Sequence, residues 1–183
     1  EILQSSSADG LSLLKVLDNT INPMGARLLK RWLVLPLKDE IKINERLNTV
    51  EYLIKEIDIK QKLTTAIKHI GDVERLASKI PMKKINPREV VQIAKGLQQI
   101  EVVKTACENS DNKYLKRLGN NLNTCSLIAN KIAEQLEELP PIATNKGNCI
   151  KQGVHSELDD LRKIASGGKE YLLNIQQREA EAT

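Results

Sequence analysis

The chain has 183 residues, a formal net charge of +4 and only 2% aromatic residues, with no phenylalanine. A chain of this length can bury about 70% of the surface that its unfolded form exposes, so it can fold without disulfide or metal staples. The charge is too small and too evenly mixed to indicate a nucleic-acid-binding protein by itself, and no apolar run reaches the roughly 18 residues of a membrane span.

The composition also predicts the fold class and the redox environment. With so few aromatic residues, the core must come from Leu, Ile, Val and Ala, which together with frequent Lys, Glu and Gln favour an all-α fold. Cys107, Cys125 and Cys149 are widely and irregularly spaced, so neither a disulfide framework nor a zinc site is expected. Their odd number suits a reducing cytosol, with Cys107 and Cys125 as buried thiols.

The first predicted elements follow residues 1–10, which we interpret as a linker because residues 5–10 are small and polar. An apolar segment at 11–17 begins the fold. Asn22-Pro23 then predicts the start of a helix, because Asn caps a first turn and Pro fits its first position. Pro36 ends this helix. Trp32 lies on its apolar face, and we expect this side chain to anchor the core.

Five further helices are predicted before Pro140, because apolar residues recur at steps of three and four. Their starts or limits, with the apolar residues that recur on them, are Asp39 (Ile43, Leu47, Val50 and Ile54), Asp58 to Ile70, Asp72 to Ile80 (Val73, Leu76 and Ile80, which are expected to face inward), Asn86-Pro87 (Val90, Ile93, Leu97 and Ile100), and Leu115 to Leu136. The last two are long and consecutive, so we expect an antiparallel pair.

The C-terminal part of the chain changes pattern twice. Gly147 and Gly153 predict a small turn or two-stranded ribbon, and Ser156 with Asp159 resembles the capping box of a last helix at 156–183. About 28 residues of helix would reach roughly 42 Å. Its apolar residues follow the three-four alternation of a seam that packs along one partner helix: Leu158, Leu161, Ala165, Gly168, Leu172 and Ile175. Glycines at 167–168 weaken its middle.

The residues offer no convincing catalytic, cofactor-binding or metal site. Gly167-Gly168-Lys169 lacks the first glycine and the final Ser or Thr of a phosphate loop. We interpret Asp72 and Glu74 as a helix cap and an ion pair with Arg75, because their positions diverge by about 200° around a helix. The acidic residues Glu157, Asp159 and Asp160 suit the positive end of a helix dipole. His69 and His155 are expected to be surface or capping residues.

The candidate DNA-phosphate contacts are basic residues, chiefly Lys83, Lys84 and Arg88. Lys83 and Lys84 are expected in a loop, where a duplex could reach them. A solvated surface is nevertheless the favoured interpretation, as it is for Lys30 and Arg31, because no aromatic residues interleave with these cations to stack on bases.

Several motifs together resemble the MutS family of DNA mismatch-recognition ATPases, in the family's order and approximate spacing. The matching segments are residues 17–37 (Leu17-Asp18-Asn19-Thr20 through Pro23-Met24-Gly25-Ala26-Arg27 to Arg31-Trp32-Leu33), 43–51, 71–76 (Gly71-Asp72-Val73-Glu74-Arg75-Leu76), 150–153, 157–162 and 178–183. Asn22 stands where the family has a first-turn Thr, and Ala26 where it has Ser. Both are mild departures.

The resemblance implies an internal piece of a longer protein, with a compact helical core domain at 11–155 and the ascending lever helix at 156–183. Its implied role is mechanical coupling of an ATPase domain to a DNA clamp, with no enzyme activity or cofactor in the piece itself. ATP, Mg²⁺, mismatched double-stranded DNA and homodimer formation would belong to the longer, DNA-dependent ATPase, in the bacterial cytoplasm at the nucleoid and away from membranes. Two alternatives remain: a MutS-like paralogue acting in recombination, and a free-standing helical adaptor that binds a partner helix through its 158–175 seam.

Overall fold

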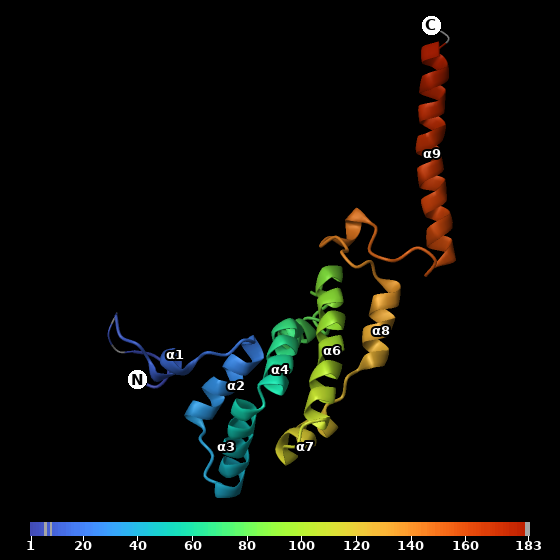
Figure 1. The fold of residues 1–183 in the computed structure, drawn as a ribbon. Helices are drawn as coiled ribbons and strands as arrows, with labels where there is room; N and C mark the ends of the chain where they lie inside the picture. The colour runs from blue at the N-terminus through green and yellow to red at the C-terminus, as the bar shows by residue number, and fades with distance from the viewer. Residues whose placement is uncertain (6, 8, 182–183) are drawn as a thin grey trace.

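The computed structural model describes residues 1–5, 7 and 9–181, and the regular structure of these residues is helical (Figure 1). The helices are α1 (Leu13–Leu17), α2 (Pro23–Val34), α3 (Glu40–Lys55), α4 (Ile57–Ile70), α5 (Val73–Ser78), α6 (Pro87–Glu108), α7 (Lys113–Asn121), α8 (Ser126–Gln135) and α9 (Ser156–Glu181), with a 3-10 turn at Thr144–Lys146. The predicted all-α fold is confirmed. In the described part of the chain, no helix is both long and apolar enough to cross a membrane.

Both Asn-Pro helix starts are confirmed. The Asn22 side chain accepts a hydrogen bond of 2.8 Å from the Met24 backbone N–H, and Pro23 is the first residue of α2. Asn86 and Glu89 form a full capping box at the start of α6, each side chain accepting from the other's backbone N–H. Caps of this kind satisfy N–H groups that the helix itself leaves free.

The core lies where α4, α6 and α7 meet, with α3 beside them. Leu63, Cys107 and Leu115 are buried together, which confirms a buried thiol at Cys107, whereas Cys125 is only half-buried. α6 is the central element: α4 lies on one side of it and α8 on the other (Figure 1).

The predicted apolar stripe of α3 faces solvent. Its exposed members are Ile43, Leu47, Val50 and Ile54. Thr49 is buried instead, and Tyr52 and Leu53 pack against the core. The helical period predicts that one face is apolar, but which neighbouring element covers that face depends on the rest of the molecule.

Trp32 also departs from expectation, because its side chain is 40% exposed and does not anchor the core. The Arg46 guanidinium lies over the indole ring, 3.6 Å from its centroid. This cation-π contact joins α2 to α3 at the surface.

The helix predicted from Leu115 to Leu136 is broken into α7 and α8. At the break, Cys125 has a left-handed backbone with φ of 48°, and its N–H donates to the Asn123 side chain at 2.9 Å. A local bond of this kind offers the backbone an alternative to continuing the helix. Both pieces still pack against α6.

The segment before α9 forms one antiparallel bridge, between Leu136 and Ile150. The predicted ribbon is therefore partly right: residues 149–151 pair with the end of α8 and not with their own turn. The predicted Ser156–Asp159 capping box is wrong. The His155 ring Nδ1 accepts from the Leu158 N–H and the His155 carbonyl oxygen accepts from the Asp159 N–H, so His155 caps α9 one residue earlier. From this point α9 extends away from the other helices (Figure 1).

Candidate functional site

Two of the sequence motifs meet in space through Arg27. Its guanidinium makes two bonds to the Asp72 carboxylate, of 2.7 and 3.0 Å, and two to the Glu74 carboxylate, of 2.6 and 3.1 Å. Asp72 also caps α5 by accepting from the Arg75 N–H at 3.2 Å. The predicted cap is confirmed, but the predicted ion pair with Arg75 is replaced by one with Arg27, from a helix 45 residues away in sequence.

This arrangement changes the titration of both partners. The hydrogen bonds from Arg27 hold the pKa of Asp72 below its ordinary value, and the same bonds raise the pKa of Arg27. Both groups are therefore charged at neutral pH. A carboxylate bound in this way by a guanidinium is a structural partner and a poor general acid or base, because its pKa lies far from the operating pH.

Asn22 ties the start of α2 to the end of α4. Besides capping α2, its buried amide donates to the carbonyl oxygens of Ile67 and Gly71, at 3.1 and 2.8 Å. A threonine hydroxyl has one proton to donate, whereas the Asn amide has two, and both are used here. Asn in place of Thr at this motif position therefore supplies an additional bond between the two helices.

The three candidate phosphate contacts do not form one cluster of free cations. Lys83 and Lys84 are exposed in the turn between α5 and α6, and Lys83 has a left-handed backbone with φ of 54°. Arg88, in the first turn of α6, donates from Nε to the Pro140 carbonyl oxygen at 3.3 Å, where it holds the loop that follows α8. Pro140 itself is fully buried.

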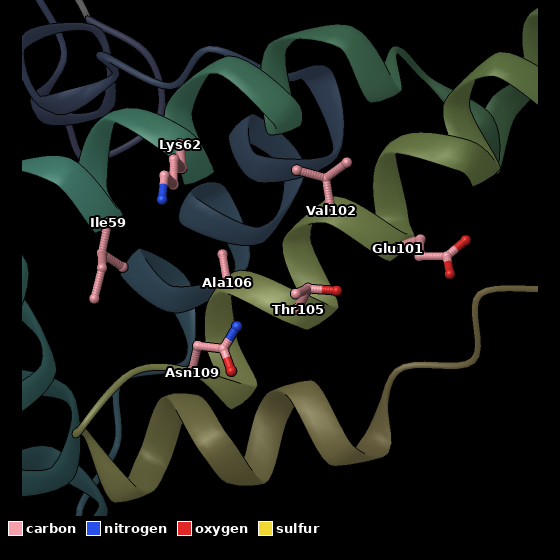
Figure 2. Close-up of a pocket in the computed structure, with 7 residues that line it drawn as sticks. All are labelled: Ile59, Lys62, Glu101, Val102, Thr105, Ala106 and Asn109. Carbon is pink, nitrogen blue, oxygen red and sulfur yellow. The ribbon is translucent and has the colours of Figure 1, made fainter.

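An open groove of about 460 Å³ lies between α4 and α6 (Figure 2). Ile59 and Lys62 line it from α4, and the remaining residues come from α6 and its end: Glu101, Val102, Thr105, Ala106 and Asn109. Most of this lining is apolar, so the groove suits packing better than chemistry.

The described residues hold no group of three or more His, Cys, Asp or Glu side chains that could bind a metal ion. Gly167 and Gly168 lie inside α9. Their backbone N–H groups belong to the helical hydrogen-bonding pattern, so the segment does not fit a phosphate loop. Of the acidic trio near the start of α9, Asp159 accepts from the Gly153 N–H at 2.7 Å, a role that its position in the sequence did not indicate.

Comparison with known proteins agrees with this largely structural site. The model of MutS domain III matches residues 1–183. The chain is 52% identical to the DNA mismatch repair protein MutS of Phocaeicola vulgatus, 51% to that of Bacteroides thetaiotaomicron and 44% to that of Cytophaga hutchinsonii. Each match covers 100% of this chain and 21% of the relative.

The chain thus spans about a fifth of the length of these relatives. The segments that meet at Arg27 and Asn22 are those that carried the resemblance in the sequence, and the similarity runs through every helix described above. The chain therefore belongs to the MutS domain III family.

Proposed function

We propose that the chain is the core and the ascending half of the lever in a DNA mismatch repair ATPase, where it couples nucleotide state to a clamp that closes around DNA. Residues 11–155 would form the core domain and 156–183 the lever helix. The observation that carries this proposal is α9: its 26 residues reach about 39 Å and extend away from the other helices (Figure 1).

Coupling between distant sites needs a stiff element with discrete placements. A long helix supplies the stiffness, and the contacts at its base supply a placement. The exposed apolar residues of α9, among them Leu172, would be covered by a returning helix of the longer protein. In this proposal ATP, Mg²⁺, mismatched double-stranded DNA and homodimer formation belong to the longer protein, in the bacterial cytoplasm. The chain itself contributes no catalytic residue.

A chimera tests the proposal directly. The matching 183 residues of the Phocaeicola vulgatus protein would be replaced by this chain, and the mutation rate measured in cells that lack their own MutS. We expect the chimera to lower the mutation rate as the unaltered relative does. A soluble, full-length chimera that leaves the rate high would contradict a mismatch repair role and favour a paralogue acting in recombination.

We also propose that Lys83, Lys84 and Arg88 contact DNA phosphates weakly. The isolated chain should bind duplexes no more tightly than about 10⁻⁴ to 10⁻⁶ M, without preference for a mismatch. Replacing Lys83 and Lys84 by Ala should reduce the slope of log affinity against log salt by about two. The control is Lys30→Ala with Arg31→Ala, on exposed cations of α2. Equal losses in both variants would show that only net charge matters.

A further inference from the structure

The segment between α8 and α9 is fixed to α8 by Lys151. Its backbone N–H donates to the Gln135 carbonyl oxygen at 2.9 Å, and its Nζ donates to the Ala133 carbonyl oxygen at 2.7 Å. These are carbonyls of the last turn of α8, which have no partner within their own helix. The Glu137 N–H completes the bridge by donating to the Cys149 carbonyl oxygen at 3.0 Å. Residues 149–151 therefore move with the end of α8.

The same segment is held from the other side by the first turns of α9. Arg162 donates from its guanidinium to the Ile150 carbonyl oxygen at 2.8 Å, and Asp159 accepts from the Gly153 N–H at 2.7 Å. Arg162 and Asp159 also pair with each other at 3.2 Å. Gly153 has φ of 87°, a conformation that glycine adopts without strain, and this turn presents its N–H to Asp159.

The neighbouring ion pair shows that these contacts are specific to one face of α9. Asp160 and Lys163 form the same kind of pair one residue further along α9, at 3.1 Å, but both of their side chains are largely exposed. The Asp159 side chain is 13% exposed, whereas that of Asp160 is 67% exposed. Both pairs have the spacing that stabilises a helix, but only the Asp159–Arg162 pair is largely shielded from solvent.

We propose that Asp159 and Arg162 are positioning residues that set the direction of α9. Together they form a latch, defined here as the bonds from these two side chains to Gly153 and Ile150. A helix connected to its domain only by a single backbone segment can rotate about that segment. Two bonds one turn apart on one face of the helix oppose such a swing. Through Lys151, the latch fixes α9 to the end of α8.

The latch has a further connection to α6. The loop between the two bridge residues, Leu136 and Ile150, contains the buried Pro140, whose carbonyl oxygen accepts from Arg88 in the first turn of α6. Any rotation of α9 with the latch closed must therefore displace this loop and the end of α8. The importance of the latch for coupling rests on the proposed function, but its effect on the direction of α9 does not.

The test measures distances in the full 183-residue chain between spin labels on α6 and on the first turns of α9. Cys107→Ala, Cys125→Ser and Cys149→Ser remove the native thiols, and Gln92→Cys and Ile164→Cys accept the labels at exposed positions. Position 164 precedes the glycine pair, so fraying of the distal helix does not blur the distance. We expect one narrow distance peak, which is lost in Asp159→Ala/Arg162→Ala and kept in the matched control Asp160→Ala/Lys163→Ala.

Exchange of the Gly153 amide, followed by NMR, gives a second measurement that does not depend on the labels. It should accelerate in Asp159→Ala and not in Asp160→Ala. If the double variant fails to fold by circular dichroism, Arg162→Lys replaces it, because Lys keeps the charge but lacks the planar fork from which Arg162 donates to Asp159 and Ile150 through two separate nitrogens. A broad distribution in the parent chain, or equal effects in the two pairs, would overturn the latch. Because these measurements use the isolated chain, they can fail while the chimera succeeds, and the reverse.

Discussion

Arg27 shows how one surface side chain can join two sequence motifs. It lies on the polar side of α2, where a solvated cation would be expected, yet its guanidinium is bound by both acidic residues of the 71–76 motif. The geometry is bidentate towards Asp72, which is the strongest form of a carboxylate–guanidinium pair. The contact therefore fixes α2 against the start of α5.

Replacing Arg27 by Gln should destabilise the chain at pH 7, and this loss should shrink in acid. The pKa of Asp72 is lowered in the folded state from its ordinary value of 3.8, chiefly by hydrogen bonds from Arg27. Its contribution is therefore present above about pH 4 and disappears as the pH falls through the lowered pKa. Urea unfolding of both proteins at pH 7 and about pH 3 measures the difference.

The control for this experiment is Lys55→Gln, which removes an exposed pair with Glu51 within α3. An exposed pair at this spacing contributes little to stability, because solvent screens it. A pH-independent loss in Arg27→Gln, or a loss no larger than that of Lys55→Gln, would contradict the role given to the Asp72 contact.

Trp32→Ala should cost less than the about 3–5 kcal/mol typical of a fully buried tryptophan, because this side chain is 40% exposed. A double-mutant cycle with Arg46→Ala should give a coupling of about 0.5–1 kcal/mol, the value for an exposed cation-π pair. Circular dichroism is the readout, since Trp32 is the only tryptophan. In the control cycle, Arg31→Ala takes the place of Arg46→Ala, and it should show no coupling to Trp32→Ala. If Trp32→Ala alone cost more than about 3 kcal/mol, Trp32 would anchor the core after all.

At the scale of elements, Gly96 permits the close packing of α6 against the end of α4. A Cβ at this position would lie 2.5 Å from the Ile70 carbonyl oxygen and 2.7 Å from Val73 Cγ2. Gly96→Ala should therefore destabilise the chain, because overpacking costs about 1–3 kcal/mol and exceeds the roughly 1 kcal/mol that Ala gains in helix propensity.

Gly167→Ala is expected to have the opposite effect on stability from Gly96→Ala, although both replace a helical glycine by alanine. Gly167 also lies inside a helix, but a Cβ there would meet nothing within 4 Å. Only the propensity gain remains, so this variant should increase the helix content of α9. Chemical denaturation and circular dichroism of the two variants compare the effects. A stabilising Gly96→Ala would show that α4 and α6 can separate without loss.

The sequence predicted elements best where the signal is local. Asn22-Pro23 and Asn86-Pro87 marked two helix starts, because a cap and the residues it satisfies lie within one turn. That the apolar stripe of α3 faces solvent was not predictable, because Ile43 and Leu47 identify an apolar face but not its neighbour. The break at Cys125 depends on a competing bond from Asn123, which the apolar spacing across the break concealed.

The candidate site was less predictable than the fold, because its contacts join distant segments. Arg27 and Asp72 were both in recognised motifs, but their pairing spans 45 residues. Arg88 is exposed, as expected, but its Nε also donates to the Pro140 carbonyl oxygen, 52 residues away. Nothing near these residues in the sequence indicates the partner.

At the scale of the whole molecule, the distal part of α9 has an apolar seam without a partner among the described residues. Leu172 is 63% exposed, and Ile175 is exposed beside it. A helix of fewer than about 12–15 residues is marginal in water without packing, and the glycine pair separates this part from the latched base. We therefore expect the amides of Leu172–Arg178 to exchange rapidly while those of α6 are protected.

Hydrogen exchange across a range of protein concentrations tests this expectation and separates its causes. Fraying is independent of concentration, whereas protection that rises with concentration would show that two copies pair their seams. Gly167→Ala with Gly168→Ala should slow exchange in the monomer, because each change favours the helix by about 1 kcal/mol. Strong protection of Leu172–Arg178 in a demonstrably monomeric, unaltered chain would mean that α9 is stable alone. It would then need no returning helix, and the proposal that it is half of a lever would lose its main physical support.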